Sequence, residues 1–227
     1  MLDVIGVLSD QAVAGPMLLS LQTAAVAAPC LATVGVCLGY LLGRGRGPWI
    51  SALDFLVTLP LVFPPIATGF LLLMLLGRRG LLGAMLSERL GVEFVFSFWG
   101  VALASFVAGL PLIVKPVQAA VQRETGRLIE AAYVLGKSRF TTFLRVVLPS
   151  IRRSVCVGLF LALARSLGEV GVTLMLGGNI VGKTNTVSLE IYNAVFTGEY
   201  DRAFALVIVL GIVSLMLVAS TRRLAVS

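Results

Sequence analysis

Five stretches of the chain are apolar, nearly free of charged residues, and long. They run from about residue 16 to 42, 49 to 76, 96 to 117, 151 to 176 and 203 to 220. A helix that crosses a bilayer needs about 20 consecutive, mostly apolar residues, and each stretch is close to or above this length. The pattern therefore predicts an all-α fold, a polytopic membrane helix bundle of about five transmembrane helices. We expect it to form a single domain over residues 1–227.

The composition agrees with a membrane protein and argues against metal chemistry. Hydrophobic residue types make up 58% of the chain and charged residues only 13%, whereas soluble domains carry about 25% charged residues. Histidine is absent, which removes the commonest metal ligand and the commonest general base. Cys30, Cys37 and Cys156 lie in apolar runs and form no Cys-x-x-Cys pair. We therefore expect no metal, no cofactor and no intramembrane active site.

Basic residues predict the orientation. Most of them fall between spans one and two, between spans three and four, and after span five. These residues are Arg44, Arg46, seven from Arg123 to Arg153, Arg222 and Arg223. Because basic loops stay in the cytoplasm, we expect these segments there, the acidic N-terminus outside and the C-terminus inside. Arg78, Arg79 and Arg89 fall on the outer side and weaken this assignment slightly. The net charge of +7 then reflects cytoplasmic loops facing lipid, not nucleic-acid binding.

The stretch GGNIVGKT, from Gly177 to Thr184, matches the G-x-x-x-x-G-K-[ST] pattern of a phosphate-binding P-loop. A P-loop needs a strand before it, a helix after it and a soluble parallel sheet around both. Here a membrane span precedes the stretch, and the predicted orientation puts it on the external side, where ATP is scarce. We interpret the glycines and Asn179 as a turn just outside the membrane, where Lys183 either attracts an anion or simply faces water.

The long basic loop, about residues 123–150, reads ETGRLIEAAYVLGKSRFTTFLRVVLPS from Glu124 to Ser150. Glu130, Ala131 and Ala132 favour a short helix, and Gly136 lets the backbone turn away from it. The loop is either an amphipathic segment lying on the membrane or a docking element for a partner.

This loop resembles the EAA loop of bacterial ABC-transporter permeases. The resemblance rests on the spacing from the Glu-Ala-Ala triplet through Gly136 to Leu148 and Pro149. Val146 stands where the pattern has isoleucine. Three further stretches are similar to the molybdate-transport branch of that family: LPLVFPPIATGFLLL, GRRGLLG and ARSLGEVGVTLMLGGNIVGKTNTVSLEIYNAV.

The resemblance implies a division of labour among subunits. It implies a homodimer of this chain as the pathway, two cytoplasmic ABC ATPase subunits that hydrolyse ATP, and a periplasmic or extracellular oxyanion-binding protein. The implied substrate is molybdate, with tungstate left open as a second one. The implied ATPase-coupling residues are Glu130, Ala131, Ala132, Gly136, Arg139, Leu148 and Pro149. Arg139 and Arg145 either pair with acidic groups of the ATPase or face lipid headgroups.

Two alternatives stay open at this point. One is the same class of permease with sulfate or tungstate as its substrate. The other is an autonomous anion channel or secondary transporter, which would leave the EAA pattern unexplained.

Several polar residues and prolines within the spans are candidates for the pathway or gate. Proline removes a backbone donor and kinks a helix, so residues 59–68 are expected to be a broken segment, in which Thr58 and Thr68 bond the freed carbonyls. Arg165 and Glu169 share one helical face and form either a structural ion pair or part of the pathway. Together the candidates are Pro60, Pro64, Pro65, Thr68, Arg165, Ser166, Glu169 and Asn179.

Two further expectations concern charged residues and small residues within the spans. Lys115 is the second basic residue deep in a span, and Asp54 is expected at the inner interface near Arg44 or Arg46. Small residues such as Gly35 and Gly39 favour close helix packing and suit a tight bundle and a dimer.

Overall fold

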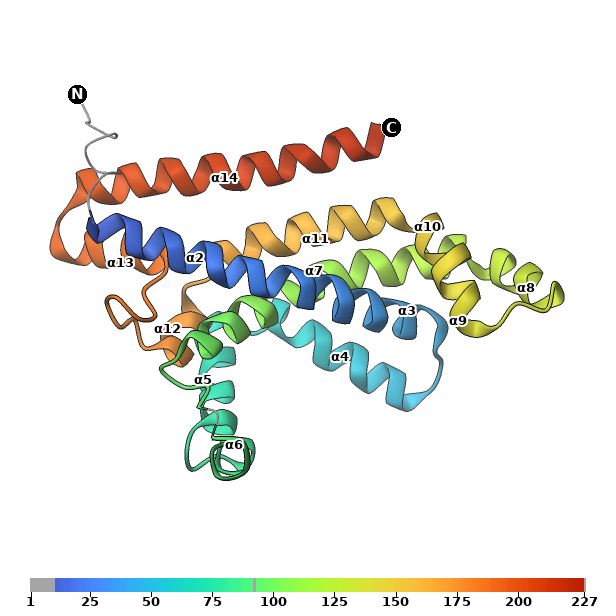
Figure 1. Ribbon diagram of the computed structural model, residues 1–227, viewed down its shortest axis with the longest axis horizontal. Helices are drawn as coiled ribbons and strands as arrows, with labels where there is room; N and C mark the ends of the chain where they lie inside the picture. Colours follow the sequence, from blue (N-terminus) through green and yellow to red (C-terminus); the bar gives the residue numbers. More distant parts are fainter. Residues whose placement is uncertain (1–10, 92, 227) are drawn as a thin grey trace.

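A computed structural model describes residues 11–91 and 93–226, and every regular element within those residues is helical. The first long helix is built from α2 (Gln11–Cys30), the π-helical turn η1 (Leu31–Gly35) and α3 (Val36–Arg44). It runs alongside α7 (Phe98–Glu124), α11 (Arg152–Leu167) and α14 (Tyr200–Val226), as Figure 1 shows. These helices form the bundle that the hydrophobic pattern predicts.

Within the described residues, three helices are long and apolar enough to cross a membrane: Val13–Arg44, Phe98–Glu124 and Tyr200–Ser220. The number rises to as many as five if each of two bent helix pairs counts as one span. The first, third and fifth predicted spans therefore appear as unbroken helices. The second and fourth do not.

The predicted second span is two helices, α4 (Pro48–Val62) and α5 (Pro65–Leu76). The cause is the proline pair that follows Phe63. A residue before proline is pushed out of the helical region, and both Phe63 (φ −75°, ψ 144°) and Pro64 (φ −55°, ψ 135°) are extended. The predicted break within residues 59–68 of this span is therefore confirmed.

The predicted fourth span also ends early. Helix α11 stops at Leu167, and after a short irregular segment α12 (Gly171–Gly177) begins. The irregular segment contains Gly168 and the charged Glu169, but the apolar run resumes at Val170. The predicted span, which continues to residue 176, therefore did not include this break.

The centre of the bundle is the contact between α3 and α7. Gly39 faces Val117, and a Cβ atom placed on the glycine would lie 2.6 Å from a Val117 methyl carbon. Gly43 faces Val121 in the same way, at 2.7 Å. Gly35 lies one turn earlier and meets Ile113, which is fully buried. Small residues spaced four apart let two membrane helices approach closely, so the predicted close packing around Gly35 and Gly39 is confirmed.

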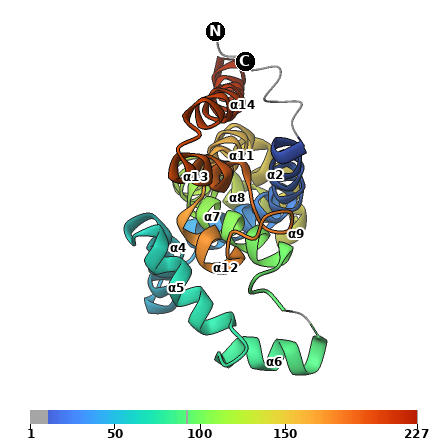
Figure 2. The same ribbon diagram turned by 90° about the vertical axis from the view of Figure 1, so that its left-hand side faces the viewer.

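The remaining elements lie at the two ends of the bundle or beside it. At one end are α8 (Gly126–Val134), α9 (Arg139–Thr142), η2 (Phe143–Val147) and α10 (Leu148–Ser150). At the other end α13 (Val187–Thr197) packs beside α14. Figure 2 shows α5 and α6 (Leu81–Leu90) extending away from the bundle. The acidic N-terminus, residues 1–10, and the side chains of Arg222 and Arg223 lie outside what the structure describes.

Candidate functional site

The breaks in the second and fourth predicted spans lie against each other. A Cβ atom on Gly171, the first residue of α12, would lie 2.8 Å from Cβ of Pro65 and 2.9 Å from the backbone nitrogen of Ile66. One turn along α5, a Cβ atom on Gly69 would lie 2.9 Å from Cα of Val172. The structure therefore brings the proline-rich candidates and the Arg165–Glu169 region into one place, which sequence separation did not predict.

The break after α11 is held by hydroxyl groups on its neighbours. The Ser166 hydroxyl donates a hydrogen bond to the carbonyl of Ser105 on α7, at 2.6 Å. The Ser188 hydroxyl of α13 donates to the carbonyl of Leu167, at 2.5 Å. The carbonyl of Leu167 lies at the C-terminal end of α11 and lacks a partner within its own helix, so the bond from Ser188 satisfies a group that the break leaves open.

Arg165 and Glu169 form the ion pair that their spacing predicts. Arg165 Nη1 lies 2.6 Å from Glu169 Oε2, and the Glu169 side chain is 1% exposed while that of Arg165 is 36% exposed. The other Glu169 oxygen accepts a hydrogen bond from the backbone N–H of Val172, at 2.8 Å. Glu169 therefore ties the end of α11 to the start of α12, where the helix dipole favours a carboxylate.

The two threonines near the proline break do not act as expected. The Thr58 hydroxyl donates to the carbonyl of Asp54, at 2.6 Å, and the Thr68 hydroxyl donates to that of Pro64, at 3.4 Å. The carbonyl that Pro60 deprives of its helical partner is that of Leu56, four residues earlier. The prediction that these threonines bond the freed carbonyl is therefore wrong, because both hydroxyls bond within their own turn of helix.

Asp54 pairs with a residue that sequence analysis did not connect with it. Its Oδ1 atom accepts a hydrogen bond from Lys115 Nζ of α7, at 2.7 Å. The location of Asp54 at the inner interface, near Arg44 or Arg46, stays a prediction. The two ion pairs Asp54–Lys115 and Arg165–Glu169 thus hold the two basic residues that lie deep within apolar helices.

GGNIVGKT folds as a turn between α12 and α13. Gly178, Asn179 and Gly182 have positive φ angles of 74°, 51° and 77°. The Thr184 hydroxyl accepts a hydrogen bond from the backbone N–H of Ile180 and donates to the carbonyl of Gly177. A helix precedes this segment, where a P-loop has a strand. The predicted turn is confirmed. The Thr184 hydroxyl already bonds the backbone N–H of Ile180, which is therefore not free to bind a phosphate as the N–H groups of a P-loop do.

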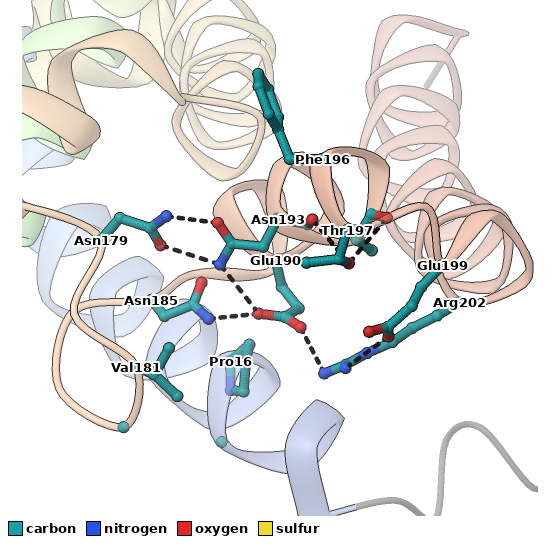
Figure 3. Close-up of a pocket in the computed structure, with 13 residues that line it drawn as sticks. Pro16, Asn179, Val181, Asn185, Glu190, Asn193, Phe196, Thr197, Glu199 and Arg202 are labelled. Atoms are coloured by element: carbon teal, nitrogen blue, oxygen red, sulfur yellow. Dashed lines mark hydrogen bonds and ion pairs between the residues drawn. The ribbon is translucent and has the colours of Figure 1, made fainter.

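Asn179 lies away from the other pathway candidates, in a polar network beside this turn. Asn179 and Asn193 of α13 donate hydrogen bonds to each other, as Figure 3 shows. The carboxylate of buried Glu190 accepts hydrogen bonds from Asn185 and Asn193 and lies 2.5 Å from the Arg202 guanidinium. These groups line a hollow of about 540 Å³. Sequence analysis missed this network, although Glu190 and Asn193 are three apart on one helical face.

At the opposite end of the molecule, the Glu-Ala-Ala triplet lies on α8. Ile129 and Ala132 are buried, while Glu130 and Ala131 on the other face are exposed. The short helix predicted for this loop is confirmed. It presents an acidic and a small side chain outward, and it is fixed to the bundle by its apolar side.

Gly136 ends this helix in a left-handed conformation, with φ +70°. The N–H of Lys137 donates to the carbonyl of Ala132 and the N–H of Gly136 donates to that of Tyr133. This arrangement closes the helix end as in a Schellman-type cap, which favours glycine at this position. Ser138 then caps α9 by accepting a hydrogen bond from the N–H of Thr141. The predicted turn at Gly136 is confirmed.

Large apolar side chains surround this turn and are open to solvent. Val134 is 88% exposed, Leu135 75% and Phe140 72%. Arg139, beside them, is exposed as well. Leu148 and Pro149 lie in α10, just before the chain bends by 74° into α11. We call Glu130, Ala131, Val134, Leu135 and Phe140 the coupling surface.

Comparison with known proteins agrees with this architecture. Residues 35–226 match the family described as binding-protein-dependent transport system inner membrane component. The chain is 36% identical over 206 residues to the molybdenum transport system permease protein ModB of Escherichia coli (strain K12), covering 90% of each chain. It is 38% identical over 202 residues to the ModB of Mycobacterium tuberculosis, covering 89% of this chain and 76% of that one.

A solved structure has the same fold. It is the crystal structure of a bacterial alginate ABC transporter in complex with its alginate-bound periplasmic protein. The match has a TM-score of 0.77 and 20% identity, and it covers 97% of this chain and 81% of that one. The resemblance inferred from the EAA loop is therefore confirmed by sequence and by fold. The chain belongs to the family of inner-membrane components of binding-protein-dependent transport systems.

Proposed function

We propose that this chain is the membrane-spanning permease subunit of an ABC importer for molybdate. The observation that supports molybdate as the substrate is the sequence identity of 36–38% to molybdenum transport permeases over nearly the whole chain. Tungstate is a second substrate within the same proposal, because it is a tetrahedral dianion like molybdate. The subunit forms the pathway and performs no covalent chemistry, and partner ATPase subunits hydrolyse ATP.

The coupling surface is the proposed docking site for those ATPases. Its geometry supports this role, since Val134, Leu135 and Phe140 leave a contiguous apolar patch on a short, well-capped helix–turn–helix. Exposed apolar patches rimmed by polar residues are typical of protein interfaces. Ala131 allows close approach, and Glu130 and Arg139 supply charges at the rim. Leu148 and Pro149 connect this unit to α11, so movement of the docked ATPase reaches the bundle through α10.

The proposed orientation follows from this docking site. The end of the bundle with α8 and α9 is cytoplasmic, and the end with α13 and the turn at residues 178–186 is external. The hollow beside Asn179 and Glu190 then opens toward the side from which a binding protein would deliver the oxyanion. The C-terminus is cytoplasmic and the N-terminus external in this arrangement.

Two copies of the chain are proposed to enclose the pathway between them. Helices α4 and α5 support this arrangement, because they lie at the side of the bundle with large apolar side chains exposed. Phe55 is 69% exposed, Val62 77% and Ile66 56%. A second copy would cover this face and turn the junction of α5 and α12 toward the dimer axis.

The junction of α5 and α12 is the proposed gate. Both helices are short, each follows a break, and glycines hold them in close contact at Gly69 and Gly171. Such a pair can move as one unit about the two breaks, while α3 and α7 stay fixed. Arg165 is the proposed cationic contact for the oxyanion at this level, with Glu169 keeping it neutralised at rest.

Uptake of molybdenum tests this proposal directly. Cells that lack the chain are compared with the same cells after it is restored, at trace molybdate, with and without an excess of sulfate or tungstate. We expect uptake to return, to ignore sulfate and to be reduced by tungstate.

Other outcomes would select the alternatives. Restored uptake that sulfate abolishes would make the chain a sulfate-type permease. Uptake that persists when the partner ATPase is inactivated would instead indicate an autonomous channel or secondary transporter. If no uptake returned, the molybdate assignment would be wrong.

A further inference from the structure

The ion pair between Asp54 and Lys115 lies on the side of the bundle that this subunit leaves uncovered. Asp54 is on α4, whose large side chains are mostly exposed, and Lys115 is on α7 at the centre of the bundle. Lys115 Nζ lies 2.7 Å from Asp54 Oδ1. The two side chains are 33% and 34% exposed, so the pair is neither sealed in the core nor out in open solvent.

The positions of Asp54 and Lys115 along their helices indicate how deep the ion pair lies in the bundle. Lys115 lies nine residues before the end of α7 at Glu124, or about 14 Å at 1.5 Å per residue. Asp54 lies six residues into α4, or about 9 Å. In the proposed orientation both helix ends are cytoplasmic. The pair therefore lies within the apolar part of the bundle, toward its inner side.

Charged groups at this depth restrict what the exposed side of the pair can face. An ion pair open to lipid loses the hydration of both charges, and ionisable residues in membrane spans therefore face a bundle interior or a water-filled cavity. Asp54 lies on α4, the helix that the proposed second copy would cover and that would border the pathway. We therefore expect the exposed parts of this ion pair to face water or a transported ion.

Arg165 provides the comparison at another depth. Its neighbour Ser166 bonds the carbonyl of Ser105, so Arg165 lies about level with that residue of α7. Lys115 lies ten residues farther toward the coupling end, or about 15 Å away along the helix. Lys115 and Arg165 are thus two cations deep in the bundle at different levels, and each has a carboxylate partner.

We propose that Lys115 is a direct contact for the oxyanion in the inner part of the pathway, with Asp54 as its counter-ion at rest. This inference rests on the proposed function. A tetrahedral dianion that arrives from the level of Arg165 takes the place of the Asp54 carboxylate on the ammonium group. When the dianion leaves, Asp54 returns, so Lys115 is neither left unpaired nor able to hold the dianion permanently.

The competing interpretation is that the pair only fastens α4 to the bundle. Within α4 only Val57 is buried, so a fastening role is physically reasonable. A test must therefore remove the cation without removing the link between the helices. Replacing both residues by residues with neutral amide side chains, Asp54→Asn with Lys115→Gln, keeps a neutral hydrogen-bonding pair at the same positions. Lys115→Arg is the matched control, because it keeps the positive charge.

The experiment uses the complete complex of permease, ATPase and binding protein in proteoliposomes. Molybdate uptake and ATP hydrolysis stimulated by the loaded binding protein are measured in parallel. For the double amide variant we expect uptake to fall about tenfold or more, the usual scale for losing a charge-assisted contact, while stimulated hydrolysis stays within about twofold of the parent complex. Lys115→Arg is expected to keep most of the uptake.

Three results would overturn the inference. Unchanged uptake in the double amide variant would show that no cation is needed there. An equal loss of uptake and stimulated hydrolysis would show a fastening role. Loss of uptake in Lys115→Arg equal to that of the double variant would show that charge is not the relevant property. If the parent complex moves no molybdate, tungstate or sulfate, the proposed function itself falls and this inference falls with it. If the parent complex does transport, each variant result bears on Lys115 alone.

Discussion

Two of the close helix contacts that glycine makes in this subunit differ in kind, one between α3 and α7 and the other between α5 and α12. The first contact uses Gly35, Gly39 and Gly43 along helices that run unbroken through the bundle. The second uses Gly69 and Gly171 on helices of 12 and 7 residues that each follow a break. Close packing at glycine therefore occurs in two settings. We call the contact between α3 and α7 the seam, and the two short helices α5 and α12, each preceded by a break, the jointed pair.

The difference lies in what surrounds each contact. Around the α3–α7 seam, Ile113, Val114 and Val117 are completely buried, so the seam is the rigid centre of the fold. Beside α12, the side chains of Pro64, Pro65 and Ile66 are exposed. A contact with exposed residues at its edge and irregular backbone before both helices can change position at lower cost. We therefore expect substitutions in the seam to affect folding and substitutions in the jointed pair to affect transport.

The largest expected effect is that of Gly39→Val in the seam. The new side chain would meet Cβ of Val117 at 2.7 Å and the carbonyl oxygen of Val114 at 3.0 Å. Overpacking of a filled core costs about 1–3 kcal/mol, occasionally more, and the rigid seam has little room to relax. We expect little folded protein in the membrane and a lower unfolding midpoint in detergent. Gly211→Val on α14 is the control, because nothing lies within 4 Å of that position; equal stability of the two variants would contradict a rigid seam.

Gly171→Ala should have a smaller effect on folding and a larger one on transport per folded molecule. Its Cβ would press on Pro65 and Ile66 and separate α5 from α12. We expect the purified protein to keep its unfolding midpoint within a few degrees, while molybdate uptake falls about tenfold. Gly168→Ala is a close control in the same break, because its nearest neighbours would be carbonyl oxygens at 3.8 and 3.9 Å. If both variants transport equally well, the α5–α12 contact is not the gate.

These contacts also show what sequence could and could not predict. Long apolar runs predicted the three unbroken spans, because length and hydropathy are local properties. The prolines predicted the break before α5, because their effect on the preceding residue is local too. The Glu-Ala-Ala triplet and Gly136 were recognised for the same reason, since a helix and its cap are determined within a few residues.

Partners across the bundle were not predictable in the same way. Lys115 as the partner of Asp54 depends on how α4 packs against α7, 61 residues apart in the sequence. The meeting of Gly171 with Pro65 depends likewise on tertiary packing, and so does the network around Glu190. Arg165 and Glu169 could be paired beforehand, because residues four apart on one helix lie on the same face.

Gly136 differs from the glycines of both helix contacts, because it is needed for its backbone angle and not for its small size. Gly136 has φ +70°, and a Cβ atom placed on it would meet nothing within 4 Å. A left-handed residue other than glycine costs roughly 1–2 kcal/mol, and here that strain would fall on the turn that orders the coupling surface. For Gly136→Val we expect a stable protein in the membrane that no longer supports uptake. Hydrolysis by the complex should then respond poorly to the loaded binding protein.

Gly91, at the end of α6, is the matched control for this effect. It has φ +63° and is equally open, so Gly91→Val introduces a comparable local strain outside the coupling surface. Measured side by side, the two variants should show similar unfolding midpoints, with uptake lost only in Gly136→Val. Normal uptake by Gly136→Val would mean that the turn does not transmit force from the ATPase. Equal loss in both variants would mean that strain in any loop is enough to stop transport, and the coupling surface would have no special role.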